Sequence, residues 1–486
     1  MVDHGSFVDV QGNYIDGRWI PPQDGRYDVV DPSTEQVIAT APDAGVADVA
    51  SAVGAARRAF DSGPWPRLDP AERGRCLQQL SDALLARADD LYRLAQQEWG
   101  CTANERLIHV EGPAFMAGHS AELASVPAEA PLDAWGAGGN TLLRYEPLGV
   151  VAAMTPWNFP HTLNVMKLGA ALAAGNTLVL KPSPLTPLAG FALARIIAEE
   201  TDIPHGVVNV VAPRGIAASR ALTQDPGVDM VSFTGSSAVG RDVMAAAAAS
   251  MKRVLLECGG KSASILVDDV EITDALLERL LFEGCTLHAG QACILNSRLL
   301  VPDAIHDEVV DRLCALARAV VLGDPRDPDT TMGPLISREH LERVETFVAQ
   351  AESEGATVRA GGRRPKDQFS GYFFEPTILT DVTPDAAIAQ EEVFGPVLTV
   401  LRYRTDDEAV VIANDSPYGL GGAVWGTDVD RALGLARGMR TGQVSINGTI
   451  AGDAPFGGFK QSGIGREGGL LGLRGYMEPK VIGVPS

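Results

Sequence analysis

The chain has 486 residues, of which 45% are hydrophobic and 21% charged, and its formal net charge is −22. This length exceeds one ordinary hydrophobic core, so we expect two or more domains, and the composition is that of a folded protein rather than a disordered one. The acidic balance excludes nucleic acids and anionic membranes as partners, because their phosphates would be repelled.

The N-terminal part predicts short strands followed by helices. Residues 14–20 and 26–42 have the composition of strands separated by Asp-Gly and Asp-Pro turns. Residues 47–60 and 69–97 predict helices, the second with Asp69 as N-cap and Pro70 at its first position. The leucines of this second helix recur at helical spacing and predict one buried face: Leu77, Leu80, Leu84, Leu91 and Leu94.

From residue 148 onward, apolar runs alternate with alanine-rich helical stretches. The runs are LGVVAAM (148–154), NTLVLK (176–181), GVVNVV (206–211), DMVSF (229–233) and RVLLE (253–257). This alternation predicts a parallel sheet covered on both faces, which is a doubly wound α/β domain. A second α/β section is predicted to start at SASILV (262–267) and to extend to GQVSING (442–448).

Polar residues and glycines follow the predicted strand ends. Because ligands bind beyond the carboxyl ends of parallel strands, we expect one crevice to hold Asn158, Lys181, Gly235, Ser236 and Glu257. The turn at 235–240 would let backbone N–H groups approach a pyrophosphate at a helix N-terminus. A plain tight turn is the alternative, and the position beside Lys181 favours a nucleotide.

The cysteines indicate a reducing compartment. All six are widely separated: Cys76, Cys101, Cys258, Cys285, Cys293 and Cys314. They form no C-x-x-C pair, so we expect neither disulfides nor a bound metal. The polar N-terminal stretch does not have the pattern of a secretory leader, and no apolar run is long enough to span a bilayer. The cytoplasm is therefore the expected location.

Seven motifs closely resemble, in order and separation, the signature motifs of the NAD(P)-dependent aldehyde dehydrogenase superfamily. They are PWNFP (156–160), KPSPLTP (181–187), FTGSSAVGR (233–241), LECGGKS (256–262), GQAC (290–293), EEVFGPV (391–397) and PFGGFKQSGIGRE (455–467). The resemblance covers nearly the whole chain. It implies a Rossmann-like cofactor domain (1–130 and 150–258), an α/β catalytic domain (259–455) and a small β element for oligomerisation (131–149 and 470–486).

The resemblance also implies a chemistry for Cys293. A lone cysteine is more often an inert core residue, but Asn158 and Glu257 favour a nucleophile here. The thiolate would add to an aldehyde and form a thiohemiacetal, whose oxyanion the Asn158 amide and the Cys293 N–H would stabilise. After hydride transfer, Glu257 would activate water to hydrolyse the thioester, with Glu467 further along the proton path.

The resemblance implies NAD as cofactor, with NADP possible. The implied contacts are Trp157, Lys181, Ser183, Arg214, Gly235, Ser236, Gly259, Glu392 and Phe394. Lys181 would bind the adenosine ribose, Ser236 the pyrophosphate and Glu392 the nicotinamide ribose. Departures from the family pattern at Pro184, Ala238 and Arg214 remove negative charge or add positive charge near the adenosine end. Arg214 therefore either reads a 2′-phosphate or points into solvent.

The substrate is predicted to be a medium-chain aliphatic or aromatic aldehyde. The tunnel positions implied by the resemblance are apolar: Phe159, Leu163, Met166, Leu287 and Phe456. The tunnel loop carries Asp453 and no cation, so a substrate carboxylate would be buried unpaired at a large desolvation cost. His288 and His161 invite a Cys–His dyad, but a loop histidine and a tunnel residue are the favoured interpretations.

Two other functions compete with aldehyde oxidation by water. In a CoA-acylating semialdehyde dehydrogenase, CoA would cleave the thioester, and the base Glu257 argues against this. A non-catalytic binding or structural protein would not need Cys293, Asn158, Glu257 and Glu392 together. The terminal strands 140–149 and 476–486 look unpaired and outside both domains, so we expect a homodimer or homotetramer.

Overall fold

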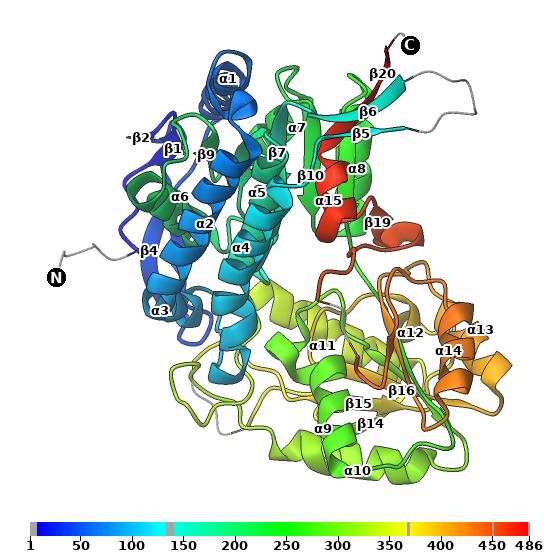
Figure 1. Ribbon diagram of the computed structural model, residues 1–486. Coiled ribbons are helices and arrows are strands. Elements are labelled where there is room, and N and C mark those ends of the chain that lie inside the picture. Colours follow the sequence, from blue (N-terminus) through cyan, green and yellow to red (C-terminus); the bar gives the residue numbers. More distant parts are fainter. Residues whose placement is uncertain (1–6, 133–139, 367–369, 450–451, 485–486) are drawn as a thin grey trace.

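The computed structural model describes residues 7–132, 140–366, 370–449 and 452–484. Parts of the predicted segments, namely 1–6, 133–139, 367–369, 450–451 and 485–486, lie outside the described residues. Figure 1 shows two α/β regions, one above the other, and a β arm at the top that carries the C-terminus. Within the described ranges, no helix combines the length and apolar character that a membrane crossing requires.

The first sheet has the strand order β19-β11-β10-β7-β8-β9-β1-β2. Its parallel centre consists of β7 (Val150–Met154), β8 (Thr177–Lys181), β9 (Val208–Val210), β10 (Met230–Thr234) and β11 (Arg253–Glu257). Antiparallel β1 (Asn13–Ile15) and β2 (Arg18–Ile20) extend one edge, and β19 (Gly463–Ile464) extends the other. All five predicted apolar runs are therefore strands of one sheet.

Helices cover both faces of this sheet. Along β7, Val151 and Ala153 pack into one core, while Val150, Ala152 and Met154 pack into another. The first core also receives α2 (Pro70–Ala86), α3 (Ala88–Glu98), α4 (Gly112–Ala124), α5 (Pro160–Ala173) and α6 (Pro187–Glu200). The second receives α1 (Val46–Asp61), α7 (Ile216–Gln224) and α8 (Ser237–Ala248). The predicted doubly wound architecture is confirmed.

The predicted single helix over 69–97 is wrong, because α2 and α3 are separated at Arg87. Asp69 does cap α2, and its side chain accepts the Ala71 N–H at 2.9 Å. Arg87 leaves helical geometry (φ −101°, ψ 10°) and its guanidinium lies 2.7 Å from the Glu200 carboxylate of α6. All five predicted leucines are buried, so the break at Arg87 changes the direction of the chain without exposing the leucine face.

The second sheet has the order β14-β15-β16-β13-β12-β17-β18. Its strands are β12 (Ala263–Leu266), β13 (Arg298–Pro302), β14 (Thr357–Ala360), β15 (Thr377–Thr380), β16 (Val397–Tyr403), β17 (Gly422–Trp425) and β18 (Ser445–Ile446). All neighbours are parallel except β14 and β15. The surrounding helices are α9 (Asp274–Leu281), α10 (His306–Ala319), α11 (Arg338–Ser353), α12 (Ala387–Gln390), α13 (Asp406–Asn414) and α14 (Val429–Gly438).

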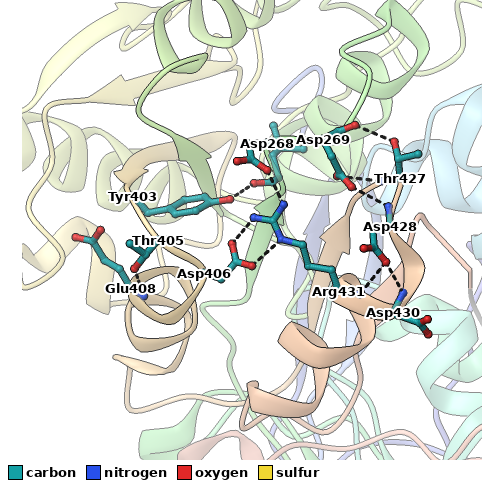
Figure 2. A network of polar contacts seen from close by, with 11 residues as sticks. Asp268, Asp269, Tyr403, Thr405, Asp406, Glu408, Thr427, Asp428, Asp430 and Arg431 are labelled. Carbon is teal, nitrogen blue, oxygen red and sulfur yellow. Dashed lines mark hydrogen bonds and ion pairs between the residues drawn. The ribbon is translucent and has the colours of Figure 1, made fainter.

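Arg431 of α14 connects the segments that follow β12, β16 and β17 in this second region, as Figure 2 shows. Its guanidinium donates to both oxygens of Asp406 at 2.7 Å and to Asp268 at 2.6 Å. Asp269 accepts the backbone N–H groups of Thr427 (3.0 Å) and Asp428 (2.8 Å). The carboxylates that follow β12 thus fix the starts of α13 and α14. We call this set the Arg431 network.

The β arm consists of β5 (Glu129–Pro131), β6 (Asn140–Pro147) and β20 (Met477–Val484), in the order β20-β6-β5. The expectation of unpaired terminal strands is wrong, because β6 and β20 pair with each other, antiparallel, over their full length. The predicted strand segment 470–486 also begins with a helix, α15 (Gly469–Gly475). Beyond these corrections, the domain boundaries stay a prediction.

The remaining elements connect these bodies. A separate hairpin is formed by β3 (Arg26–Val30) and β4 (Val37–Pro42). Short 3₁₀ turns lie at Trp65–Arg67, Ala103–Glu105 (η2), Leu287–Gly290 (η5) and Lys460–Ser462. Two π-helical turns, Leu107–Glu111 (η3) and Phe282–Thr286 (η4), lie near the segments that carry the site. Turns of this kind are frequent at functional sites.

Candidate active site

The carboxyl ends of the central parallel strands meet at one edge of the first sheet. The Thr155 N–H, just after β7, donates to the Lys181 carbonyl at 3.1 Å. The Gly235 N–H, just after β10, donates to the Glu257 carbonyl at 3.0 Å. The sheet therefore brings together strand ends that the sequence predicted to share a crevice.

Cys293 lies at the end of a constrained loop that follows η4. We call residues 287–293 the nucleophile loop. Asn158 Nδ2 donates to the Gln291 carbonyl of this loop at 2.8 Å, and an amide carries a second N–H that can serve a ligand. Cys293 is partly exposed, whereas every other cysteine is buried. Cys285 and Cys258 fit their predicted packing roles, and Cys293 is the cysteine that a reactant can approach.

The Cys293 thiol is surrounded by protein and by negative charge. Burial raises its pKa above the ordinary range for cysteine, and the carboxylates of Glu392 and Glu257 raise it further. A Cβ added to Gly260 would lie 2.3 Å from the Cys293 carbonyl oxygen, so the loop after β11 contacts this residue closely. The nucleophilic form of Cys293 is the thiolate, so Cys293 has to lose its proton before it can react.

Glu257 is the last residue of β11, and only 2% of it is exposed. Neither of its carboxylate oxygens has a hydrogen-bond partner among the residues that the structure describes. Burial raises its pKa well above the usual range, and the nearby Glu467 carboxylate adds to this. A Cβ at Gly457 would lie 2.6 Å from Glu257 Oε1, so only glycine leaves room for the carboxylate. An unpartnered carboxylate is free to accept a proton from a reactant.

A buried ion pair lies behind Glu257. Lys167 of α5 donates to Glu467 Oε1 at 2.9 Å and to Ser232 Oγ at 3.1 Å. Ser232 Oγ in turn lies 2.8 Å from the Tyr476 hydroxyl. The sequence predicted Glu467 but missed Lys167, although a lysine within the apolar pattern of α5 was a usable signal. These groups lie close enough to Glu257 to act on it electrostatically, since Glu467 raises its pKa and Lys167 lowers it.

The predicted cofactor positions begin at the end of β8. Burial lowers the pKa of Lys181 to about 8, and its ammonium makes a long hydrogen bond of 3.4 Å to the Pro182 carbonyl. Ser183 lies just beyond, where its hydroxyl accepts the Leu185 N–H at 3.2 Å. An ammonium has three donors, so Lys181 can also bind ribose hydroxyl groups.

The turn before α8 fits a phosphate. A Cβ at Gly235 would lie 2.5 Å from the Phe233 ring, so the position requires glycine. Ser236 is the N-cap of α8 and accepts the Val239 N–H at 3.3 Å. Exposed N–H groups at such a helix start bind anions, and this favours the nucleotide over the plain turn.

Glu392, another predicted cofactor position, lies beside the loop after β11, and Phe394 lies beside Trp157. Glu392 Oε1 accepts the Gly260 N–H at 2.9 Å, and a Cβ at Gly259 would lie 2.4 Å from Glu392 Oε2. Burial raises the pKa of Glu392 to about 7. The rings of Trp157 and Phe394 meet edge to face at 5.3 Å. These residues fit the nicotinamide end of a dinucleotide.

Helix α11 supports Glu392 and Phe394, and the sequence did not predict this. His340 Nε2 lies 2.6 Å from the Phe394 carbonyl, and Arg343 donates to the Glu392 carbonyl at 2.8 Å. Phe394 has a left-handed backbone (φ 62°), which such contacts hold in place. No local motif marks His340 and Arg343, because they belong to a separate helix and contact the Glu392 and Phe394 carbonyls through space.

Arg214 is exposed, and its backbone N–H donates to Asp43 Oδ1 at 2.8 Å. A carboxylate therefore lies at the segment where Arg214 was predicted to add positive charge. Asp43 lies far from Arg214 in the chain, so no reading of the family motifs could have found it.

The predicted tunnel residues are all partly exposed: Phe159, Leu163, Met166, Leu287 and Phe456. Leu163 and Met166 lie nearly one turn apart on α5, and Phe159 immediately precedes that helix. Phe456 and Glu467 exchange both backbone hydrogen bonds, at 2.6 and 2.7 Å. The pairing places a predicted tunnel residue next to a predicted proton-path residue.

The two candidate dyad histidines lie in a buried aromatic cluster. His288 contacts His109 and His161 contacts Trp99, each with ring centroids 5.0 Å apart, and Phe159 stacks on His109 at 4.5 Å. Burial lowers the pKa of His288 to about 3 and that of His161 to about 4. The expectation that His161 lines the tunnel is wrong, because only 4% of it is exposed.

One group of side chains in the described residues has metal-ligand spacing. Ligand atoms of Cys101, Glu105 and His109 lie within 4.8 Å of one another. Each already has a protein partner: Cys101 Sγ contacts the Thr102 carbonyl, Glu105 accepts backbone N–H groups, and His109 Nδ1 accepts from Trp99 at 3.1 Å. These hydrogen bonds explain the cluster without an ion.

Comparisons with known proteins agree with this geometry. The aldehyde dehydrogenase family matches residues 19–482. The chain is 38% identical to betaine aldehyde dehydrogenase of Bacillus subtilis, over 96% of each chain, and 40% identical to geranial dehydrogenase of Castellaniella defragrans, over 98% of this chain and 99% of that one. Betaine aldehyde dehydrogenase of Staphylococcus aureus, solved in complex with NAD⁺, superposes with a TM-score of 0.94 at 37% identity, covering 98% of this chain and 95% of that one.

Proposed function

The chain belongs to the aldehyde dehydrogenase family, and on that premise we propose that it oxidises an aldehyde to the carboxylic acid with NAD. The observation that carries the proposal is the partly exposed Cys293 beside a buried Glu257 carboxylate without partners among the described residues. A nucleophile and an unused base in one crevice are what thioester chemistry requires.

In the first step, the Cys293 thiol loses its proton to water and its sulfur bonds to the aldehyde carbon. The carbonyl oxygen becomes an oxyanion, which accepts the free N–H of the Asn158 amide and the backbone N–H of Cys293. Asn158 is oriented for this by its bond to Gln291. The product of the step is a thiohemiacetal on Cys293.

When bound, NAD accepts the hydride that leaves the thiohemiacetal carbon, and a thioester on Cys293 remains. Lys181, Ser236 and Glu392 would hold the dinucleotide, supported by Ser183, Gly235 and Gly259. Glu257 then takes a proton from water as the water oxygen attacks the thioester carbon and the carbon–sulfur bond breaks. The pair of Glu467 and Lys167 passes that proton onward.

The proposed substrate is an uncharged medium-chain aliphatic or aromatic aldehyde. The half-buried apolar positions along α5, together with the stacked Phe159 and neutral His109, favour an apolar chain over a carboxylate. Betaine aldehyde and geranial, in the names of the relatives, differ in charge and so do not decide between substrates. Comparison of kcat/KM for octanal, benzaldehyde and succinate semialdehyde tests this, and a preference for the semialdehyde contradicts it.

NAD is the proposed cofactor, and use of NADP depends on Arg214. The exposed Arg214 side chain could pair with a 2′-phosphate, whereas the neighbouring Asp43 carboxylate would repel it. We expect Asp43→Asn to raise kcat/KM with NADP and Arg214→Ala to lower it, with smaller changes for NAD. Equal effects on both cofactors would show that these residues do not read the phosphate.

The proposed assembly is a homodimer or homotetramer in the cytoplasm. All six cysteines are free, which suits a reducing compartment. The edge strand β20 exposes most of its residues and offers unpaired backbone groups to a second copy. Light scattering at micromolar concentration tests this, and a monomer contradicts it.

Rapid mixing with an aldehyde and NAD tests the reaction itself. The wild type should produce a burst of NADH followed by steady turnover, and Cys293→Ala should produce neither while still binding NAD. Turnover that requires CoA would identify the acylating alternative, and a wild type without any burst would identify a non-catalytic protein.

A further inference from the structure

Left-handed residues lead into the proposed nucleophile. His288, Ala289 and Gly290 have φ values of 48°, 51° and 78° in succession. Glycine adopts this region freely, but residues with a Cβ rarely do. Such a backbone persists only where surrounding contacts hold it. The start of the nucleophile loop therefore depends on contacts that oppose its relaxation.

A buried carboxylate from the N-terminal region supplies one of these contacts. Glu105, the last residue of η2, accepts the His288 N–H on Oε1 at 2.5 Å, across 183 positions of sequence. Its other oxygen accepts the Thr102 N–H at 3.1 Å. Only 1% of Glu105 is exposed, so water cannot replace it as the acceptor. Glu105 thus joins the segment before α4 to the nucleophile loop.

The other contacts of the loop hold different atoms. Gln291 Nε2 donates to the His288 carbonyl at 2.9 Å, and Gln291 Oε1 accepts the Ile336 N–H at 2.9 Å. Asn158 holds the Gln291 carbonyl. These bonds hold the His288 and Gln291 carbonyls and the Gln291 side chain, whereas Glu105 holds the N–H where the left-handed run begins.

We propose that Glu105 is a positioning residue that sets Cys293 by holding the left-handed turn at His288. The inference rests on the proposed function of Cys293 as the nucleophile. Without the carboxylate, the turn relaxes toward right-handed backbone, and Cys293, five residues after His288, moves with it. The sulfur then no longer lies where Asn158 and Glu257 serve it.

Glu98 offers a matched control. It is fully buried and accepts two backbone N–H groups, from Leu188 at 2.6 Å and Ala189 at 3.1 Å. Burial raises the pKa of Glu98 to about 8 and that of Glu105 to about 7, so the two carboxyls have similar surroundings. The Glu98 bonds cap α6 rather than the nucleophile loop. Loss of Glu98 removes the same kind of interaction from a different place.

The test measures the rate at which iodoacetamide alkylates Cys293 in the full chain, followed by mass spectrometry of its peptide. We expect Glu105→Ala to slow alkylation by about tenfold or more, because small displacements of reacting atoms have large effects on rate. Glu98→Ala should stay within about twofold of the wild type, because the two backbone bonds of Glu98 go to the start of α6. Glu105→Gln, whose amide oxygen can still accept the His288 N–H, should fall between wild type and Glu105→Ala.

A rescue variant separates positioning from general destabilisation. Ala289→Gly in the Glu105→Ala background removes the Cβ from a left-handed residue, so it should restore most of the alkylation rate. Where the alanine variant does not fold, Glu105→Asp replaces it, since its shorter side chain keeps the charge but loses reach. The same variants should lower kcat for aldehyde oxidation with little change in KM.

The proposal is overturned if Glu105→Ala reacts like the wild type, if Glu98→Ala slows alkylation equally, or if Ala289→Gly restores nothing. Failure of the proposed function has a different signature. In that case the wild type itself would keep full aldehyde turnover after alkylation at Cys293, whatever the variants do.

Discussion

Two clusters of charge in this molecule have similar composition and opposite character. The Arg431 network places several carboxylates around one guanidinium, and each anchoring carboxylate accepts donors from side chains or backbone. The cluster of Glu257, Glu467 and Lys167 also has more carboxylates than cations. There, Glu257 has no hydrogen-bond donor in the part of the chain that the structure describes.

The two clusters also differ in their exposure to solvent. The Arg431 side chain is 34% exposed, whereas Lys167 and Glu467 are 0% and 2% exposed. Donors from Asp428 and Thr427 lower the pKa of Asp269, while burial raises that of Glu257. A satisfied carboxylate at the surface fixes structure. A buried carboxylate left without donors keeps its capacity to take a proton, and this distinguishes the site from the scaffold.

The largest expected effect comes from Glu257→Gln, which removes the base and keeps the shape. Turnover should fall by about 10²–10⁴, the usual contribution of a general base. Rapid mixing should still show one burst of NADH per site, because hydrolysis of the thioester is the step that fails. Loss of the burst together with turnover would mean that Glu257 is also required to ionise Cys293.

Lys167→Met should give the next effect, on stability. It leaves the Glu467 carboxylate buried without its cation, which typically costs about 3–5 kcal/mol in free energy of unfolding. Urea denaturation at fixed protein concentration measures this. The double variant Lys167→Met/Glu467→Leu should regain most of the loss, since it removes the stranded charge. A loss below about 1 kcal/mol for the single variant would contradict the assignment.

The pH dependence should separate the clusters further. Because Glu257 has a raised pKa, it is protonated at neutral pH and becomes a base only at higher pH. When thioester hydrolysis limits turnover, kcat should increase as pH rises above neutrality. The increase should be up to about tenfold per pH unit until the pH reaches the pKa of Glu257. A group with a raised carboxyl pKa contributes stability at low pH that is lost as pH rises through that pKa.

The alkaline loss of stability should therefore be smaller in Glu257→Gln, which cannot ionise. Arg431→Gln, which leaves Glu257 in place, should keep the wild-type rise of kcat with pH. A flat kcat profile in the wild type between neutral and alkaline pH would contradict the raised pKa.

Arg431→Gln should have the smallest effect, about 1 kcal/mol, because its partners are partly solvated. Turnover should be unchanged, since the network joins residues 268–269, 406 and 427–431, and no predicted site residue is among them. High salt should shrink the difference from wild type, whereas the effect of Lys167→Met should persist. A loss as large and salt-insensitive as that of Lys167→Met would erase the distinction between the two clusters.

Much of the fold followed from local pattern. The apolar runs at 148–154, 176–181, 206–211, 229–233 and 253–257 are all parallel strands, because a strand buried on both faces has to be apolar throughout. Asp69 and Pro70 marked the start of α2 correctly, since capping is a local interaction. The end of that helix at Arg87 was missed, because its partner Glu200 lies on α6.

The candidate site shows the same contrast between features set by local sequence and features set by long-range contacts. The places of Cys293, Asn158 and Glu257 in the fold were predictable, because each residue stands in a short motif in a loop or at a strand end. Lys167 with Glu467, Glu105 with His288, and Asp43 with Arg214 were not, since these partners are separated by 300, 183 and 171 positions. Residue type and spacing specify what a side chain can do and which backbone it prefers. Only tertiary packing decides which distant groups surround that side chain. Those groups determine whether it is shielded from water and whether it has a hydrogen-bond donor.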